Sequence, residues 1–273
     1  MTPHPVRRLA EIYQAKFRAE IALQFAYRGA ILIWLLGLVI QPTVSLVVWT
    51  TVADSRGGAP TAGFTAGDFA AYFAVLMVVN QLTFTWHFGT MQWRIQQGFF
   101  SPLLLRPVHP VHNDVAENLT FKLLTLTVVL PTAALLMVAF RASFAPAPWH
   151  VAAFALALPL AMLLRFIVEW TVGLAAFWVT KMGALNQTYF VVTLFLSGQI
   201  APLVLLPGPV QVLASVLPFR WMVSFPVEVL LGRLRPDEVA IGLLVQVVWI
   251  AIAVFILRLA WAAGIRRYSA VGA

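Results

Sequence analysis

An arginine and a glutamate stand four residues apart inside an apolar stretch of this chain. Arg165 and Glu169 lie in the segment 151–179, and this spacing places both side chains on one face of a helix, where they can form an ion pair. A lone arginine at mid-bilayer costs about 2.5–3.5 kcal/mol, which pairing lowers. Two hypotheses stay open. The pair is structural and lies near the inner membrane boundary, or Glu169 faces an inner vestibule, where it attracts a cationic substrate or steers the helix during opening.

Other residue types that carry chemistry are sparse. His109 and His112 are separated by Pro110 and have no carboxylate in the same run, so the sequence predicts no metal site there. The sequence contains no cysteine, which excludes thiolate ligands and a cysteine nucleophile. It also lacks the phosphate-loop, dinucleotide-binding, zinc-protease and nucleophile-elbow motifs. We therefore expect no metal or cofactor bound by this chain, and no enzymatic reaction.

The composition indicates an integral membrane protein. Of the 273 residues, 61% are hydrophobic and only 10% are charged, and the mean hydropathy is +0.88. A soluble domain carries about 25% charged residues. The net charge of +8 is typical of basic loops that face anionic lipid on the cytoplasmic side, rather than of nucleic-acid binding.

Six apolar segments predict an all-α membrane protein that forms a single transmembrane domain over residues 1–273. A membrane-spanning helix needs about 20 apolar residues. The predicted segments are 30–53, 69–90, 119–140, 151–179, 187–200 and 239–262. Charged residues interrupt the first part of the chain, so residues 1–28 are predicted to form an amphipathic helix at the membrane interface rather than a cleavable signal.

The distribution of basic residues predicts the orientation. Eleven of the 18 Lys and Arg residues fall on the side that carries both termini: Arg7, Arg8, Lys16, Arg18, Arg28, Arg94, Arg106, Lys122, Lys181, Arg266 and Arg267. Five fall on the other side: Arg56, Arg141, Arg220, Arg233 and Arg235. Because basic loops remain in the cytoplasm, both termini are predicted to be cytoplasmic.

The link between the second and third segments, residues 91–118, combines apolar and basic residues on the predicted cytoplasmic side. Leu103, Leu104 and Leu105 stand beside Arg106, and Pro107 ends the run. This pattern suits a short helix that docks into a groove on a partner. An alternative is an interfacial segment that rests on lipid headgroups.

The fifth apolar segment is short and runs into a stretch that a straight helix cannot cross. Helix-breaking residues punctuate it at Gly198, Pro202, Pro207, Gly208 and Pro209, and a further apolar piece, 210–217, ends before Pro218 and Phe219. We predict two re-entrant helices over residues 198–220 that form a gate at the outer mouth, because broken backbone at membrane depth must be covered by protein or line a cavity. The alternative is an interfacial hairpin that caps the bundle. Residues 226–234 are predicted to form an amphipathic helix at the outer surface.

These segments resemble the type 2, export-type permeases of ABC transporters (ABC-2). The resemblance rests on the Gly98 to Pro107 pattern, on the stretch from Ser197 to Pro207, and on the stretch from Leu217 to Leu234, and it extends over essentially the whole chain. It is closest to the bacterial subgroup in which two different permeases are encoded with one ATPase.

The resemblance implies an assembly of two permeases and two ATP-binding subunits. ATP and Mg would bind in the ATPase and not in this chain. The link from Gly98 to Pro110 would be a coupling helix on that ATPase, with Gly98, Leu103, Leu104, Arg106 and Pro107 as coupling residues. The outer gate would include Gly198, Pro202, Pro207, Pro218 and Phe219.

The expected function is therefore the permease subunit of an ATP-driven exporter, in the inner membrane of a bacterial cell. Its expected cargo is an amphiphilic or hydrophobic compound such as a drug, natural product or lipid, as in multidrug efflux. Two alternatives from other classes remain at this point: an integral membrane lipid-modifying enzyme, and an ATP-independent channel.

Overall fold

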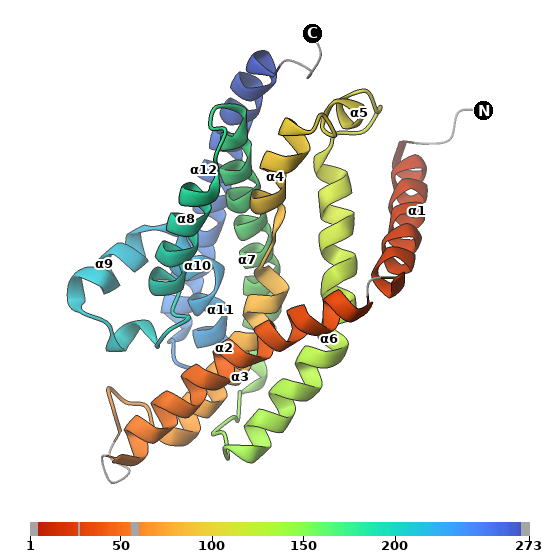
Figure 1. Cartoon of the computed structure of the whole chain (residues 1–273). Coiled ribbons are helices and arrows are strands. Elements are labelled where there is room, and N and C mark those ends of the chain that lie inside the picture. The colour runs from red at the N-terminus through yellow and green to blue at the C-terminus, as the bar shows by residue number, and fades with distance from the viewer. Residues whose placement is uncertain (1–4, 27, 56–59, 269–273) are drawn as a thin grey trace.

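The computed structural model describes residues 5–26, 28–55 and 60–268, with only the backbone described for part of the first two helices. Apart from an isolated bridge between Thr61 and Phe64, the regular structure in these ranges is helical, which confirms the all-α class. The elements in chain order (Figure 1) are α1 (Pro5–Ala26), α2 (Arg28–Ser55), α3 (Ala66–Thr83), α4 (His87–Gln96), α5 (Ser101–Leu104), α6 (Val111–Ala139), α7 (Pro148–Leu174), η1 (Ala175–Phe177), α8 (Gly183–Leu196), η2 (Leu203–Leu205), α9 (Gly208–Val216), α10 (Pro218–Met222), α11 (Ser224–Leu230) and α12 (Pro236–Arg267).

Four helical stretches in the described residues are long and apolar enough to cross a membrane. They are Ala66–Gln96, Val111–Ala139, Pro148–Phe177 and Pro236–Arg267, and they coincide with the second, third, fourth and sixth predicted segments. The first predicted segment falls within α2, and the fifth is divided because α8 ends at Leu196. The chain is thus a multi-pass membrane protein.

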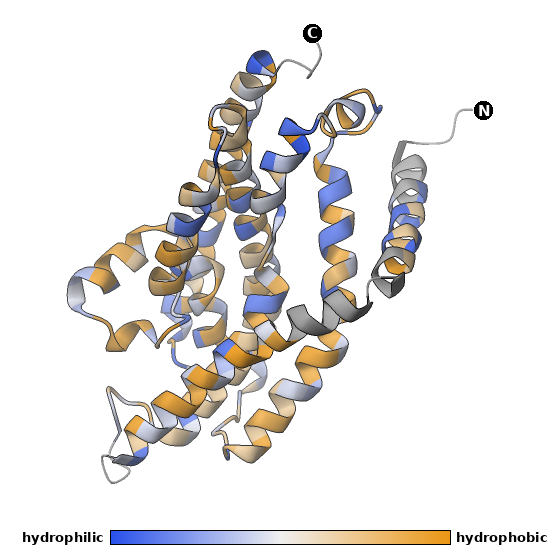
Figure 2. Cartoon of the chain, viewed as in Figure 1, coloured by the Kyte–Doolittle hydropathy of each residue, from blue (hydrophilic) through white to orange (hydrophobic). Residues whose placement is uncertain are grey.

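Hydropathy changes along the bundle. Figure 2 shows α6 hydrophilic in its first turns, near α5, and hydrophobic further along. Large apolar side chains are exposed along α12, including Leu244, Phe255 and Leu259, as expected for a helix that faces lipid. The start of α1, the short helix α5 and the end of α12 all lie at the same end of the bundle (Figure 1).

Of the four stretches long enough to cross a membrane, the one that contains α3 is the most buried, and α3 packs against α2, α6, α7 and α11. It begins with a capping box, in which the Thr65 hydroxyl and the Asp68 carboxylate each accept a backbone N–H from the other residue. Its aromatic residues Phe69, Tyr72 and Phe73 are fully buried in the largest hydrophobic cluster of the described residues. This helix therefore forms the centre of the fold.

Between α3 and α4 the helix is interrupted at residues 84–86. Neither proline nor glycine causes this break. At the end of α3 the Thr83 hydroxyl donates to the Val79 carbonyl, and after the break the Thr85 backbone N–H donates to a carboxylate on α7. A long-range hydrogen bond thus replaces a helical one, and the interruption lies beside the site described below.

The helix expected at 226–234 on the outer surface differs in the structure. The observed helix, α11, begins earlier, at Ser224, and ends at Leu230, and Phe225, Pro226, Val227 and Val229 are buried in it. It packs against α7 and α3. The prediction of an amphipathic surface helix is therefore wrong. The segment is instead buried by α7 and α3, whose packing the sequence pattern does not indicate.

Candidate substrate pocket and its flanking elements

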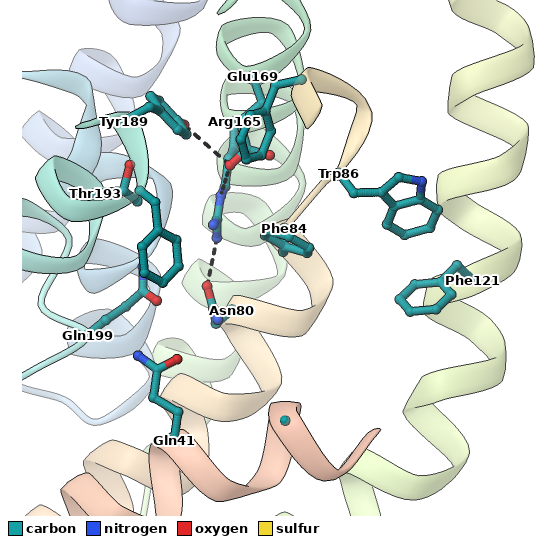
Figure 3. A pocket seen from close by; sticks show the side chains of 13 residues that line it. Gln41, Asn80, Phe84, Trp86, Phe121, Arg165, Glu169, Tyr189, Thr193 and Gln199 are labelled. Carbon is teal, nitrogen blue, oxygen red and sulfur yellow. Dashed lines mark hydrogen bonds and ion pairs between the residues drawn. The ribbon is translucent and has the colours of Figure 1, made fainter. Parts of the chain in front are cut away.

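A pocket of about 350 Å³ lies among α2, α3, α6, α7 and α8, beside the break between α3 and α4 (Figure 3). Its wall is mainly apolar and contains six aromatic side chains, three amide side chains and one ion pair. It is lined by Gly37, Gln41, Asn80, Phe84, Trp86, Phe88, Phe121, Arg165, Glu169, Tyr189, Phe190, Thr193 and Gln199. An apolar pocket with a few convergent polar groups is the usual form of a small-molecule site.

The ion pair in the pocket joins Arg165 and Glu169, the two residues four apart on α7. Arg165 Nε donates to Glu169 Oε1 over 2.7 Å, and the two side chains are 4% and 0% exposed. Burying two charges away from water is costly unless their remaining hydrogen-bonding groups are also satisfied. The other hydrogen bonds made by Arg165 and Glu169 therefore determine whether the buried pair is stable.

Three other elements contribute to this network. The Arg165 Nη1 group donates to Asn80 Oδ1 and to Thr83 Oγ1 at the end of α3, at 2.8 and 2.9 Å. Glu169 accepts the Thr85 backbone N–H at 2.8 Å and the Tyr189 hydroxyl of α8 at 3.3 Å. The pair thus connects α7 with α3, with the break after α3 and with α8.

Sequence reasoning identified the pair but missed its partners. Asn80, Thr83 and Thr85 interrupt the otherwise apolar segment 69–90, and that concentration of polar residues is the signal that could have found them. Which charged group they serve depends on the packing of α3 against α7. The sequence gives no measure of that packing.

A second ionic cluster lies where α4 meets the first turns of α6. Arg94 Nη1 contacts Asp114 Oδ1 at 2.5 Å, and Nη2 contacts Glu117 Oε2 at 3.1 Å. Asp114 also accepts the indole N–H of Trp170 at 2.8 Å. The buried His87 ring has Nε2 3.8 Å from each carboxylate.

His87, Asp114 and Glu117 are close enough together to offer three ligand atoms to a metal ion. The same two oxygens, Asp114 Oδ1 and Glu117 Oε2, are however bound by Arg94. A cation at that position would have to displace the guanidinium. The arrangement thus fits an ion-pair network that joins α4 to α6 better than a metal centre.

The two histidines after α5 have separate environments. The His109 ring lies 4.4 Å from the ring of Trp261, and the His112 Nδ1 atom is 2.9 Å from the Tyr13 hydroxyl of α1. Partial burial lowers the pKa of His109, and the nearby His112 acts in the same direction. His109 thus connects the link after α5 to α12, and His112 connects the first turn of α6 to α1.

In the predicted coupling link, some side chains pack into the protein and others are exposed. Gly98 has φ +74°, a conformation that favours glycine, and it turns the chain between α4 and α5. Leu103 and Leu104 pack against a buried cluster that includes Phe100 and Trp170. Leu105, by contrast, is 87% exposed.

Further residues extend this outward surface. Arg106 and Pro107 are exposed, and on the preceding part of the same link the exposed rings of Trp93 and Phe99 stack at 4.6 Å. Gln92 and Gln96 each donate to the Thr180 carbonyl, which ties α4 to the link between η1 and α8. The surface of Trp93, Phe99, Leu105, Arg106 and Pro107 is called the end surface below.

The residues of the predicted gate lie between α8 and α11. Gly198, which follows the end of α8, has φ +78°, and its carbonyl accepts the buried Tyr72 hydroxyl at 3.0 Å. Pro202 is buried and Pro207 is exposed, while Pro218 begins α10. The Phe219 ring lies 6.0 Å from that of Tyr189, so the gate segment adjoins the pocket.

Gly198→Ala is expected to destabilise the fold by about 1–3 kcal/mol. A Cβ at this position would lie 2.6 Å from the Tyr72 hydroxyl, and the positive φ adds backbone strain. The measurement is the melting temperature of the detergent-solubilised protein. Gly183→Ala is the matched control, because a Cβ there meets nothing within 4 Å. Equal melting temperatures for the two variants would contradict the assigned turn.

The helical bundle with an interior ionic pocket defines the chain as a polytopic membrane protein. A family model described as "ABC-2 family transporter protein" matches residues 20–272. The chain therefore belongs to the ABC-2 family of transporters, which confirms the resemblance inferred from its residues. No curated protein and no solved structure is similar enough to add to that assignment.

Membership of this family defines the general role of the chain. It is the membrane component of an ABC transporter, a transport subunit rather than an enzyme, and ABC-2 permeases work with ATP-binding subunits.

Proposed function

We propose that this chain is the permease of an ATP-driven exporter that moves an amphiphilic or hydrophobic compound out of a bacterial cell. The observation that carries the proposal is the pocket of about 350 Å³, which combines six aromatic side chains with a buried ion pair. Aromatic walls suit the apolar body of such a compound, and the polar groups suit its polar end.

The energy for transport would come from ATP and Mg bound to a partner ATPase. The sequence of this chain has no phosphate loop. The link that carries Gly98, Leu103, Leu104, Arg106 and Pro107 would receive the ATPase. In this proposal Leu105 and Arg106 touch the partner, while Leu103 and Leu104 transmit its movement to the buried cluster around Trp170.

The segment with Gly198, Pro202, Pro207, Pro218 and Phe219 would be the outer gate. Movement of α10 would displace Phe219, which lies against Tyr189, and Tyr189 donates to Glu169 in the pocket. Opening would therefore change the pocket through the ion pair. The equilibrium between closed and open bundles would be biased by ATP binding elsewhere.

The complete assembly would contain two ATP-binding subunits and a second permease, different from this chain. We place both termini in the cytoplasm and the protein in the bacterial inner membrane. Basic residues concentrate on the predicted cytoplasmic side, and α5 and the end of α12 lie at one end of the bundle (Figure 1).

Affinity purification of the chain from its host in mild detergent, followed by mass spectrometry, is expected to recover an ABC ATPase and a second permease. Recovery of both would support the heteromeric exporter. Recovery of the ATPase without a second permease would indicate that the transporter contains two copies of this chain. The chain with no ATPase at any salt concentration would contradict the proposal and favour a membrane enzyme or a channel.

A further inference from the structure

Three uncharged amide side chains line one side of the pocket. Gln41 comes from α2, Asn80 from α3 and Gln199 from the turn after α8. They lie toward the lower left of Figure 3, and the rings of Trp86 and Phe121 lie to the right. All three also line a smaller cavity of about 50 Å³, so they form one group, which is called the amide cluster below.

The amide cluster has hydrogen-bonding groups that the fold does not use. Gln41 is exposed, and its amide makes no hydrogen bond to any other described residue. The Asn80 Oδ1 atom accepts from Arg165, while the NH2 group of Asn80 has no acceptor among the residues that the structure describes. The Gln199 NH2 group donates to the Ser197 hydroxyl, while its Oε1 atom has no donor in the described part of the chain. The cluster therefore offers both donors and acceptors to a ligand, without any charge.

The position of Gln41 in the sequence adds to this observation. The residue lies in the middle of the apolar segment 30–53, which the sequence predicts to span the membrane. A polar side chain at such a position is costly unless it has a partner, and it commonly belongs to a substrate path. Because Gln41 lines the pocket, a compound bound there would supply the partner that the fold does not.

The charged side chains that line the pocket balance each other. Arg165 donates to Glu169 over 2.7 Å, and its guanidinium also lies 5.4 Å from the centre of the Phe84 ring. Glu169 accepts two further hydrogen bonds, from the Tyr189 hydroxyl and from the Thr85 backbone. A charged ligand would enter this largely apolar pocket without a counter-charge, and burial of an unpaired charge is costly.

From these groups we infer that the pocket takes an uncharged aromatic compound whose polar end both donates and accepts hydrogen bonds, such as a primary amide or sulfonamide. The polar end would lie against the amide cluster, and the aromatic body would lie against Trp86 and Phe121 (Figure 3). This inference rests on the proposed function and narrows its substrate class. It differs from the sequence-based hypothesis that Glu169 attracts a cationic substrate, because that carboxylate already accepts three hydrogen bonds.

Four probes with the same aromatic group separate charge from hydrogen bonding. The full chain in phosphatidylcholine nanodiscs is titrated with neutral dansylamide, its N,N-dimethyl derivative, anionic dansylglycine and cationic dansylcadaverine. Energy transfer from tryptophan to dansyl reports binding, and empty discs give the background. Dansylamide is expected to bind about tenfold more tightly than either charged probe, and about fivefold more tightly than the dimethyl derivative, which has no N–H donor. The dimethyl derivative is the more apolar of the two neutral probes, so partition into lipid cannot explain this order.

Substitutions at Gln41 test the site. Gln41→Leu is expected to lower dansylamide affinity about fivefold and to remove its preference over the dimethyl derivative. Gln41→Glu places a carboxylate at the pocket and should reverse the preference in favour of dansylcadaverine. Thr51→Leu and Thr51→Glu are the matched controls, at an exposed position of the same helix that does not line the pocket, and they should not change the order of the probes.

The melting temperature separates lost binding from lost folding. Gln41 is exposed and makes no hydrogen bond within the described chain, so both of its variants should have the melting temperature of the unmodified protein. The inference would be overturned if a charged probe bound as tightly as dansylamide, if dansylamide showed no saturable binding, or if its affinity were unchanged in Gln41→Leu. The titrations contain no ATPase. The inference can therefore fail while an ATPase is still recovered with the chain, and the proposed exporter would then require another substrate class.

Discussion

Glu169→Ala is expected to lower the stability of the protein by about 3–5 kcal/mol, the largest loss for any ion pair in the described residues. The substitution leaves the Arg165 guanidinium buried and without its carboxylate, and it frees the Thr85 backbone N–H and the Tyr189 hydroxyl. An uncompensated buried charge costs more than the net stabilisation from the pair. The measurement is the melting temperature of the detergent-solubilised protein.

The matched control is Glu228→Ala, which removes the partner of Arg220. That pair is of similar length, 2.8 Å against 2.7 Å, but its side chains are 27% and 14% exposed, so water can solvate the arginine that remains. The double change Arg165→Gln with Glu169→Gln removes both charges and should recover more than half of the loss. If Glu169→Ala and Glu228→Ala lower the melting temperature equally, the pocket pair is solvated and the interpretation of a buried network is wrong.

The sequence could predict those parts of the site that depend on local spacing. Residues four apart on one helix predicted the pair of Arg165 and Glu169, because helical geometry alone brings such side chains together. Asn80 and Tyr189 come from α3 and α8, and only the packing of those helices on α7 brings them to the pair. Sequence periodicity contains no such information.

The break between α3 and α4 could not be predicted from the sequence either, because it also depends on tertiary contacts. The sequence predicts a single segment over 69–90, because the polar residues within it do not by themselves indicate a helix break. The observed break at 84–86 frees the Thr85 N–H for Glu169, and the Phe84 carbonyl accepts from Asn118 of α6. Tertiary hydrogen bonds thus replace helical ones at the position where the pocket forms.

In the predicted coupling link, residue type alone does not predict which side chains are buried. Leu103, Leu104 and Leu105 are identical in type and adjacent, yet the first two pack inward and the third is exposed. The difference arises because α5 is a single turn, fixed by the buried Phe100, and ends at Leu104. Identical residues thus acquire different roles from the direction in which this turn faces.

Leu105→Asp should weaken the binding of the partner ATPase about 30-fold or more, which corresponds to about 2 kcal/mol, without changing the melting temperature of the chain alone. An 87% exposed leucine makes few contacts within its own chain, so its substitution leaves the fold intact. A charge placed in an apolar groove of the ATPase would have no counterpart there. The measurement is the affinity of the purified permease for its ATPase, together with substrate-stimulated ATP hydrolysis.

Leu104→Ala separates docking from packing. Its side chain packs against the cluster around Trp170, so this change should lower the melting temperature and uncouple hydrolysis from transport while the ATPase still binds. Arg106→Ala should weaken docking, and Arg266→Ala, at an exposed arginine at the end of α12, is its matched control. Unchanged ATPase affinity in both Leu105→Asp and Arg106→Ala would show that the ATPase docks elsewhere. In that case the exposed leucine and its neighbours would more simply be explained as residues that rest on lipid headgroups.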